Sequence, residues 1–152
     1  MGSSIGNFPR GDAVEFLRSI AKILKGSDRV MVAVDGCHSS EVVHPAYNDR
    51  SGKTHEFIRN GLTHANNVLG QQAFNQNDWE VRGVYSQSEG RHTASFRALR
   101  PVRIGSVSIR EGEQIQIEES NKYNDAETRQ LFQAAGLVRL ATHVNRASDY
   151  CE

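Results

Sequence analysis

The chain has 152 residues, enough for one modest domain with a real core. Its 18 basic residues balance 18 acidic ones, so the formal net charge is zero and no Lys/Arg cluster marks a surface for nucleic acid or anionic membrane. The longest apolar run, residues 30–34, is far shorter than the roughly 20 residues of a membrane span, and the first residues lack the pattern of a secretory signal.

The first predicted elements are a helix and a strand. Asp12 with Glu15 three residues later has the spacing of a capping box, so we expect a helix to begin there and to end at Gly26. The continuous apolar run at 29–34 predicts a strand buried on both faces of a parallel sheet. Because a helix followed by a buried strand is the second half of a βαβ unit, we expect its first strand upstream of this chain.

Helical signals continue in the middle of the chain. A short helix is expected around residues 45–47, followed by a polar loop. Residues 54–69 predict a long amphipathic helix, which Gly70 ends. Its apolar stripe consists of Ile58, Leu62, Ala65 and Leu69.

Beyond residue 78 the apolar period alternates, which predicts antiparallel strands with turns before Gly90 and Gly112. These strands are expected at 78–86, 91–99, 102–110 and 113–120. Asn124 with Glu127 then predicts a capped helix over 125–135.

A last strand is expected at 137–144. Parallel strands at 29–34 and 137–144 alone would leave a sheet with open edges and without its central strands. The predicted fold class is therefore α/β, with part of the sheet outside this chain.

The opening GSSIG matches G-x-S-x-G, the nucleophile elbow of serine hydrolases, with Ser4 as the nucleophile. An elbow needs a buried strand directly upstream, and only Met1 precedes the motif here. A serine hydrolase using Ser4 is thus a third alternative for the function, and a plain turn residue is the other interpretation of Ser4.

Cysteine and histidine spacing gives no metal site. Cys37 and Cys151 lie far apart and form neither a disulfide framework nor a C-x-x-C site, so we expect a reducing, cytoplasmic compartment. None of the six histidines has the spacing that sets ligands on one face. These are His38, His44, His55, His64, His92 and His143.

Polar residues near the end of the predicted sheet suggest a binding surface. Because side chains alternate in a strand, Glu118 and Ser120 are neighbours on one polar face. The pair could hydrogen-bond a nitrogenous group of a ligand, or the face is simply the wet side of the sheet. Asn7, Tyr47 and Phe57 also have plain interpretations, as a turn cap, a half-buried aromatic and helix core.

The combination of motifs resembles the histidine-specific, S-adenosylmethionine-dependent methyltransferase family. The likeness runs from Gly2 to about Tyr150. The family includes the histidine Nα-trimethylating enzymes of ergothioneine biosynthesis and the fungal dimethylallyltryptophan N-methyltransferases. The matching stretches, in chain order, are GSSIGNFPR, VMVAVDG, AYNDRSGKTHEFIRNGLTHANNVLG, FNQNDWEV, GRHTASF and IEESNKY.

The resemblance implies the C-terminal portion of a Rossmann-like methyltransferase with an inserted α+β substrate-binding region. The implied division is 1–50 for part of the core, 51–125 for the substrate-binding region, and 126–152 for the return to the core with truncated last strands. The implied cofactor is S-adenosylmethionine, whose glycine loop and ribose-binding acid belong to an N-terminal part that this chain lacks.

The resemblance also implies roles for residues at the amino-acid end of the substrate. Asn7 and Tyr47 match positions that hold the amino and carboxylate groups. Ser4 lies where a hydroxyl can join them, and Phe57 matches an aromatic beside the pocket.

Other positions match the ring end of the substrate. Glu118 and Ser120 match the pair that hydrogen-bonds imidazole in the histidine enzymes. Ala94 stands near the place of a bulkier methionine, and a smaller residue opens room for a larger ring such as indole. The implied substrate is therefore histidine or a tryptophan derivative.

The resemblance implies an N-methyltransferase that acts on the α-amine of an aromatic amino acid by direct in-line transfer, without a metal or covalent intermediate. Because the cofactor half is missing, the alternative is a noncatalytic remnant or partner subunit that self-associates or pairs with a companion chain.

Overall fold

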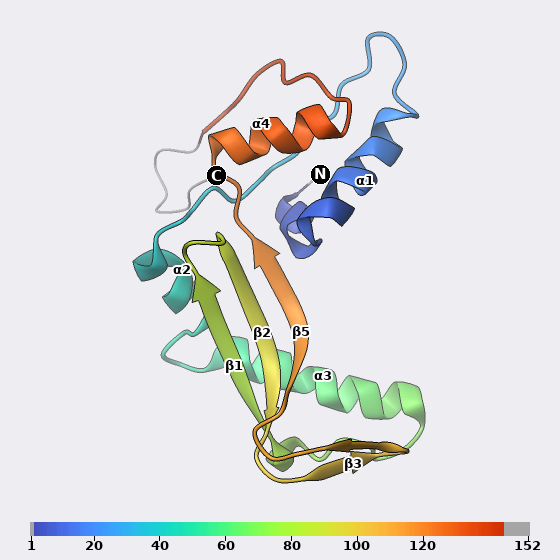
Figure 1. The fold of residues 1–152 in the computed structure, drawn as a ribbon, viewed down its shortest axis with the longest axis vertical. Coiled ribbons are helices and arrows are strands. Elements are labelled where there is room, and N and C mark those ends of the chain that lie inside the picture. The colour runs from blue at the N-terminus through green and yellow to red at the C-terminus, as the bar shows by residue number, and fades with distance from the viewer. Residues whose placement is uncertain (1, 145–152) are drawn as a thin grey trace. The chain divides into compact units, whose positions relative to one another are not determined.

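The computed structural model describes residues 2–144, which form two compact units with separate apolar cores. The first unit comprises Met1–Val43, Tyr85–His92 and Glu119–Glu152, and the second His44–Val84 and Thr93–Glu118. Cys151 and the end of the predicted 126–152 region lie outside the described residues. The fold class is mixed α/β, as predicted (Figure 1).

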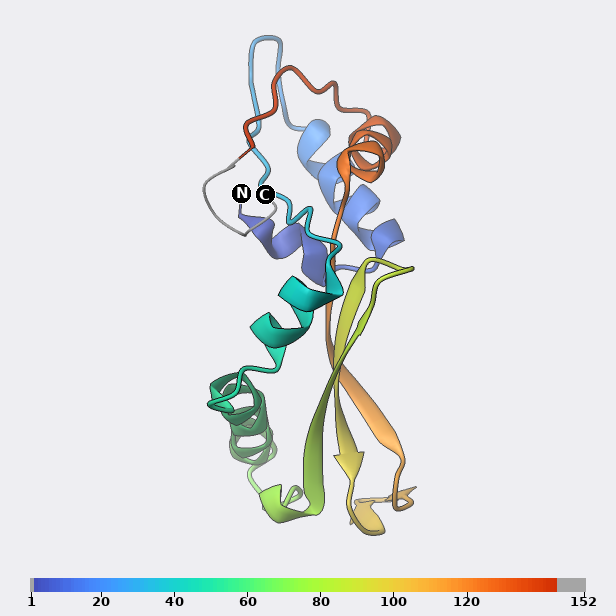
Figure 2. The ribbon, with the colours of Figure 1, turned by 90° about the vertical axis from the view of Figure 1, so that its left-hand side faces the viewer.

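Helices build the first unit. The 3-10 helix η1 (Ser3–Asn7) leads into α1 (Arg10–Ala21), and α1 packs beside α4 (Asp125–Ala134) (Figures 1 and 2). Their facing side chains are almost wholly removed from water. This core contains Ile5, Ala13, Leu17, Tyr123, Leu131 and Ala135.

The second unit buries Ile58 and Leu62 of α3 (Lys53–Leu69), whereas Leu69 of the predicted stripe is 51% exposed. Trp79 packs edge-on against Phe96 in this core, with ring centroids 6.3 Å apart. The short η2 (Gln76–Asp78) precedes the first strand, and α2 (Ser40–Tyr47) precedes the loop before α3. The remaining buried members are Ile58, Leu62, Val81, Ala94, Ala98 and Ile109.

Two sheets are present in the described residues. The larger has the order β1-β2-β5, and the arrows of neighbouring strands run in opposite directions (Figure 1). Its strands are β1 (Trp79–Ser86), β2 (Arg91–Ala98) and β5 (Gln114–Asn121). The smaller sheet is an antiparallel hairpin of β3 (Val102–Ile104) and β4 (Val107–Ile109), with Arg103 opposite Ser108.

Elements with strong local signals confirm the predictions. Helix α3 ends at Gly70, which has a φ of 64°. Asn124 and Glu127 form the expected capping box at the start of α4. The three strands at 79–86, 91–98 and 114–121 are antiparallel neighbours, as the alternating pattern indicated.

The predicted strands at 29–34 and 137–144 are wrong, because neither segment belongs to a sheet in the described part of the chain. A strand needs a hydrogen-bonding neighbour, and neither segment has one there. Val32 and Val34 are instead half-buried and pack against the apolar core of the first unit, while Met31 is 79% exposed.

Other boundaries also differ from the prediction. Helix α1 begins at Arg10 after Pro9 and ends at Ala21, so Asp12 is not its cap and Gly26 does not end it. The single strand expected at 102–110 is the β3–β4 hairpin, in which Gly105 turns the chain with a φ of 58°. Helix α2 starts five residues earlier than expected, at Ser40. Within residues 2–144, no helix combines the length and hydrophobicity needed to cross a bilayer.

Candidate functional site

The predicted substrate residues of the first unit lie near the C-terminal end of β5. Ser4 and Asn7 lie on η1, and both are exposed. Gly6 lies so close to the chain at Asn121 that an added Cβ would be 2.7 Å from the Asn121 carbonyl oxygen. The Asn121 amide donates to the carbonyl oxygens of Gly6 (3.2 Å) and Phe8 (2.9 Å). The end of β5 therefore fixes the backbone that carries Asn7.

Ser120 contacts a buried lysine. The Lys122 side chain is 2% exposed, and its Nζ lies 2.6 Å from Asp35 Oδ2. The same Nζ donates to Ser120 Oγ at 3.1 Å. Asp35 Oδ1 in turn accepts from the Cys37 backbone N–H at 2.9 Å. We call Asp35, Ser120 and Lys122 the Lys122 cluster.

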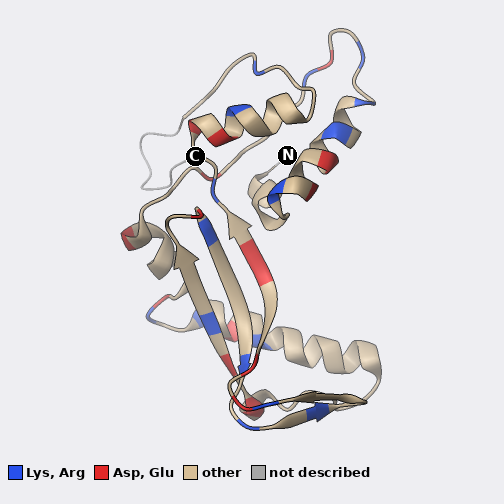
Figure 3. Ribbon diagram, in the orientation of Figure 1, with Lys and Arg blue, Asp and Glu red and all other residues tan. Residues whose placement is uncertain are grey.

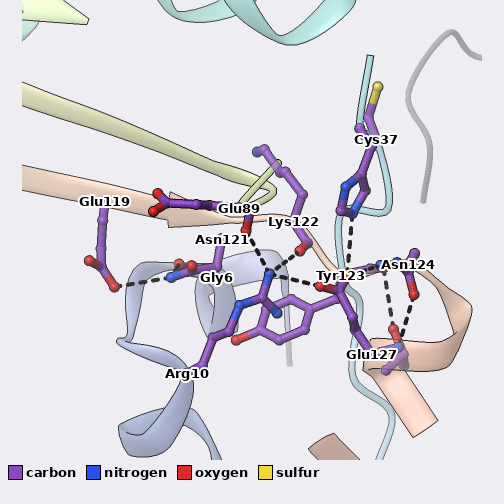
Figure 4. Close-up of polar contacts among 12 residues, drawn as sticks. Gly6, Arg10, Cys37, Glu89, Glu119, Asn121, Lys122, Tyr123, Asn124 and Glu127 are labelled. Carbon is purple, nitrogen blue, oxygen red and sulfur yellow. Dashed lines mark hydrogen bonds and ion pairs between the residues drawn. The ribbon is translucent and has the colours of Figure 1, made fainter. Parts of the chain in front are cut away.

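Backbone bonds hold the segments around this cluster together. Tyr123 N–H donates to the Asp35 carbonyl at 2.8 Å, and Lys122 N–H donates to the Gly90 carbonyl at 2.7 Å. These bonds join the end of β5 to the turn before β2 and to the segment after residue 34. Sequence-distant parts of the unit thus meet at residues 120–123 (Figure 4).

Arg10, at the start of α1, also contacts residues 122 and 123. Its guanidinium lies 4.6 Å from the centroid of the Tyr123 ring and donates to the Lys122 carbonyl at 3.1 Å. The guanidinium also forms an ion pair of 3.1 Å with Glu127 (Figure 4). His38 Nε2 lies 3.4 Å from the same carboxylate. The Arg–aromatic contact holds the N-terminus of α1 against the connection after β5, and the ion pair holds it against α4.

Two tyrosines in this unit have perturbed pKa values. Burial is the largest cause that raises the pKa of Tyr85, whose hydroxyl donates to the Cys37 carbonyl at 3.4 Å. Burial also raises the pKa of Tyr123, and its hydroxyl has no hydrogen-bond partner among the described residues. Both phenols are therefore kept neutral at ordinary pH, and neither is poised as a base.

The second unit holds the other predicted residues. Tyr47 ends α2 and is half-buried, and Glu118 is half-buried on β5. Phe57 on α3 is 76% exposed, so the alternative that it is helix core is wrong. Ala94 on β2 is 0% exposed and belongs to the apolar core of this unit.

Hydrogen bonds of Asn48 fix the chain directly after Tyr47. Asn48 Oδ1 lies 2.9 Å from a ring nitrogen of His55, and the Asn48 amide donates to the His44 carbonyl at 3.0 Å. Gly83 leaves room for this amide, because a Cβ there would be 2.6 Å from Asn48 Oδ1. The end of α2 is therefore held to the start of α3.

Neither a metal site nor a cofactor loop is complete in the described residues. No three His, Cys, Asp or Glu side chains gather there as metal ligands. In the part of the chain that the structure describes, the only strand that leads directly into an α-helix is β5, and its connection is Lys122-Tyr123-Asn124. This connection has no glycine, and Lys122 and Tyr123 are buried, so the described residues do not fit S-adenosylmethionine by themselves.

Ser4 does not have the surroundings of a nucleophile elbow. It lies inside η1 and is exposed, whereas an elbow serine lies on the turn between a strand and a helix. The sequence did not single out Lys122, although it continues the i, i+2 alternation of Glu118 and Ser120 by one step.

Comparisons with known proteins identify the family of the chain. The family model for histidine-specific, SAM-dependent methyltransferases matches residues 1–152. Ergothioneine biosynthesis protein 1 of Neurospora crassa is 43% identical over 93% of this chain, and its counterpart in Schizosaccharomyces pombe is 34% identical over 99%. The L-tryptophan methyltransferase of Psilocybe serbica is 29% identical over 99%.

The chain spans 16%, 20% and 44% of the length of these three relatives, respectively. It therefore corresponds to a part of each of them. The match of the family model covers the whole chain. The chain belongs to the histidine-specific, S-adenosylmethionine-dependent methyltransferase family.

Proposed function

We propose that this chain is the substrate-binding part of an S-adenosylmethionine-dependent N-methyltransferase that acts on the α-amine of an aromatic amino acid, histidine or a tryptophan derivative. The observation that carries the proposal is the junction at the end of β5. There, the Asn121 side chain donates to the backbone carbonyls on either side of Asn7. Ser120 directly precedes Asn121 in the sequence. Two of the residues implied to bind substrate are thus tied to one short segment.

In this proposal the two ends of the amino acid are held by different residues. Asn7 and Tyr47 bind the amino and carboxylate groups, with Ser4 beside them and Phe57 against the ligand. Glu118 and Ser120 bind the ring, and Ala94 leaves space next to it. The half-buried Glu118 supports a ligand with an N–H group, because a carboxylate accepts hydrogen bonds only.

The contribution of these residues to catalysis is orientation. Holding the α-amine in one direction and excluding water supplies much of the acceleration in a direct transfer between two bound molecules. The methyl donor is S-adenosylmethionine, the cofactor of the family. We assign its binding loop to the part of the relatives that this chain does not span.

The proposed domain division follows from the same assignment. Residues 1–50 and 126–152 belong to a Rossmann-like core, and residues 51–125 form an inserted α+β substrate-binding region. The separate apolar core built on α3 and the strands supports a distinct substrate-binding region.

Replacement of Glu118 tests the ring-binding role. We expect Glu118→Ala to weaken binding of L-histidine to the chain about tenfold or more, because a charge-assisted hydrogen bond contributes roughly 1.5–3 kcal/mol. Binding of L-tryptophan should change by less than about threefold. Isothermal titration calorimetry measures both, and Gln116→Ala, at an exposed position two residues earlier on β5, is the matched control. Equal losses for both ligands would refute the role of Glu118.

A second candidate function is a noncatalytic partner subunit. It is favoured by the apolar segments at 29–34 and 137–144, which lie outside both sheets and expose Met31 and Val138 to 79% and 83%. A partner that supplies strands would cover them. Calorimetric titration of S-adenosylmethionine into the purified chain tests what the two candidates share: we expect no binding by the chain alone, and binding would contradict both the partner-subunit candidate and our assignment of the cofactor loop.

A further inference from the structure

The largest fully buried side chain of the described residues is a lysine, Lys122, rather than an apolar residue. Next in volume are Ile5, Leu17 and His92. A buried ammonium is expensive unless it is paired and hydrogen-bonded. Lys122 satisfies this condition through Asp35 Oδ2 at 2.6 Å and Ser120 Oγ at 3.1 Å. The ion pair with Asp35 explains how the fold tolerates a buried charge. The contact with Ser120 indicates what the Lys122 ammonium group does there.

We infer that Lys122 is a positioning residue that, anchored by Asp35, sets the orientation of the Ser120 hydroxyl toward the substrate. The inference rests on the proposed function, because Ser120 contacts a ligand only in that proposal. An ammonium group has donors and no acceptor, so Ser120 Oγ is the acceptor in its contact with Lys122. A hydroxyl that accepts from a cation is polarised and becomes a stronger donor.

The anchor of Lys122 is itself fixed at more than one atom. Asp35 Oδ1 accepts from Cys37 N–H at 2.9 Å, and the Asp35 carbonyl accepts from Tyr123 N–H at 2.8 Å. The carboxylate therefore cannot rotate without breaking a bond. Lys122 N–H also donates to the Gly90 carbonyl at 2.7 Å, so both ends of the lysine are held.

This geometry distinguishes Lys122 from a substrate-binding or catalytic lysine. Its side chain is 2% exposed, and its Nζ is engaged by groups of its own unit. In our inference its effect on a ligand passes through Ser120, which its Nζ contacts. The effect of replacing Lys122 on ligand binding should therefore depend on whether the Ser120 hydroxyl is present, whereas replacement of a purely structural lysine would not show this dependence.

A double-mutant cycle tests the inference on the full 152-residue chain. L-histidine is the probe, and its dissociation constant is measured by calorimetry for wild type, Lys122→Met, Ser120→Ala and the double variant. We expect Lys122→Met to weaken binding about tenfold in the wild-type background. In the Ser120→Ala background the same change should alter the dissociation constant by less than about twofold. An equal loss in both backgrounds would overturn the inference.

Two further variants keep the test decisive. Lys53→Met removes an exposed lysine that pairs with Glu56 at 2.9 Å, and it should leave binding unchanged. Lys122→Arg keeps the charge and donors, and it should restore part of the affinity. If circular dichroism shows Lys122→Met unfolded, Asp35→Asn replaces it in the cycle, with the same expected dependence on Ser120.

The outcomes separate the inference from the proposed function. A folded wild-type chain that binds neither L-histidine nor L-tryptophan refutes the proposed function, and the inference falls with it. A chain that binds but gives an additive cycle refutes only the role of Lys122.

Discussion

Gly6 occupies a place in η1 where the chain leaves no room for a side chain. A Cβ at this position would be 2.7 Å from the Asn121 carbonyl oxygen, and that neighbour is backbone, which cannot move aside alone. We expect Gly6→Ala to displace η1 and to destabilise the protein by about 1–3 kcal/mol, the usual range for overpacking. Thermal unfolding followed by circular dichroism measures the loss.

Gly2→Ala is the matched control for this substitution, because no atom lies within 4 Å of a Cβ at Gly2. Its melting temperature should stay close to that of wild type. Displacement of η1 should also weaken amino-acid binding, since Asn7 follows Gly6 directly. Identical melting temperatures for the two variants would show that η1 is not held against Asn121.

The candidate site was partly predictable at this scale. The alternation of polar residues along 114–120 places Glu118 and Ser120 on one face without any structure. Lys122 follows the strand, where the alternating pattern no longer draws attention to it. The contact between Asn121 and Gly6 joins residues 115 positions apart, and no local pattern encodes such a contact.

At the scale of elements, Asp49 fixes the beginning of α3. Its carboxylate accepts from the Ser51 hydroxyl and from the backbone N–H groups of Lys53 (3.0 Å) and Thr54 (2.8 Å). These bonds, led by the one from Ser51, hold the pKa of Asp49 well below its usual value. A carboxylate at a helix N-terminus also interacts favourably with the helix dipole.

The depressed pKa of Asp49 predicts a dependence of stability on pH. Because the pKa is lower in the folded state than in the unfolded state, the stabilisation is complete above the ordinary pKa of 3.8 and is lost as the pH falls below it. We expect Asp49→Asn to lower the melting temperature at pH 7 and to flatten its decline as the pH falls below 3.8. Glu111→Gln, at an exposed turn position, is the control. Parallel pH profiles for Asp49→Asn and wild type would contradict the assignment.

Elements were predictable where their signals are local. The capping box of α4, the glycine that ends α3 and the alternation of β1, β2 and β5 each lie within a few residues. The prediction of a strand at 29–34 was wrong because an apolar run shows only that burial is favourable, whereas a strand also needs a hydrogen-bonded neighbouring strand. Gly105-Ser106 is a two-residue hairpin signal that the alternation on both sides obscured.

At the scale of the whole molecule, charge does little to keep copies of the chain apart. The formal net charge is zero and the sequence pI is near 7.0. Figure 3 shows both signs together on α1 and on α4. Proteins with a net charge near zero tend to associate at that pH, particularly where apolar surface is exposed.

We therefore expect the 152-residue chain to self-associate at pH 7.0 through the segment that contains Val138 and Leu140. These residues are 83% and 67% exposed, and their segment lies outside both sheets, so it can pair with another copy as an unprotected edge does. Val138→Lys combined with Leu140→Lys should lower the association constant about tenfold or more in sedimentation velocity experiments.

The control for this variant must add the same charge elsewhere. Val68→Lys with Leu69→Lys replaces two apolar residues of α3 that are 72% and 51% exposed. If net charge alone governs association, both double variants should reduce it equally. If the segment at 137–144 is the contact, only the first variant should do so, because lysines remove its apolar surface and repel their counterparts in a second copy. A wild-type chain that stays monomeric at concentrations of about 100 μM would refute the prediction, and it would also weaken the case for a partner at this segment.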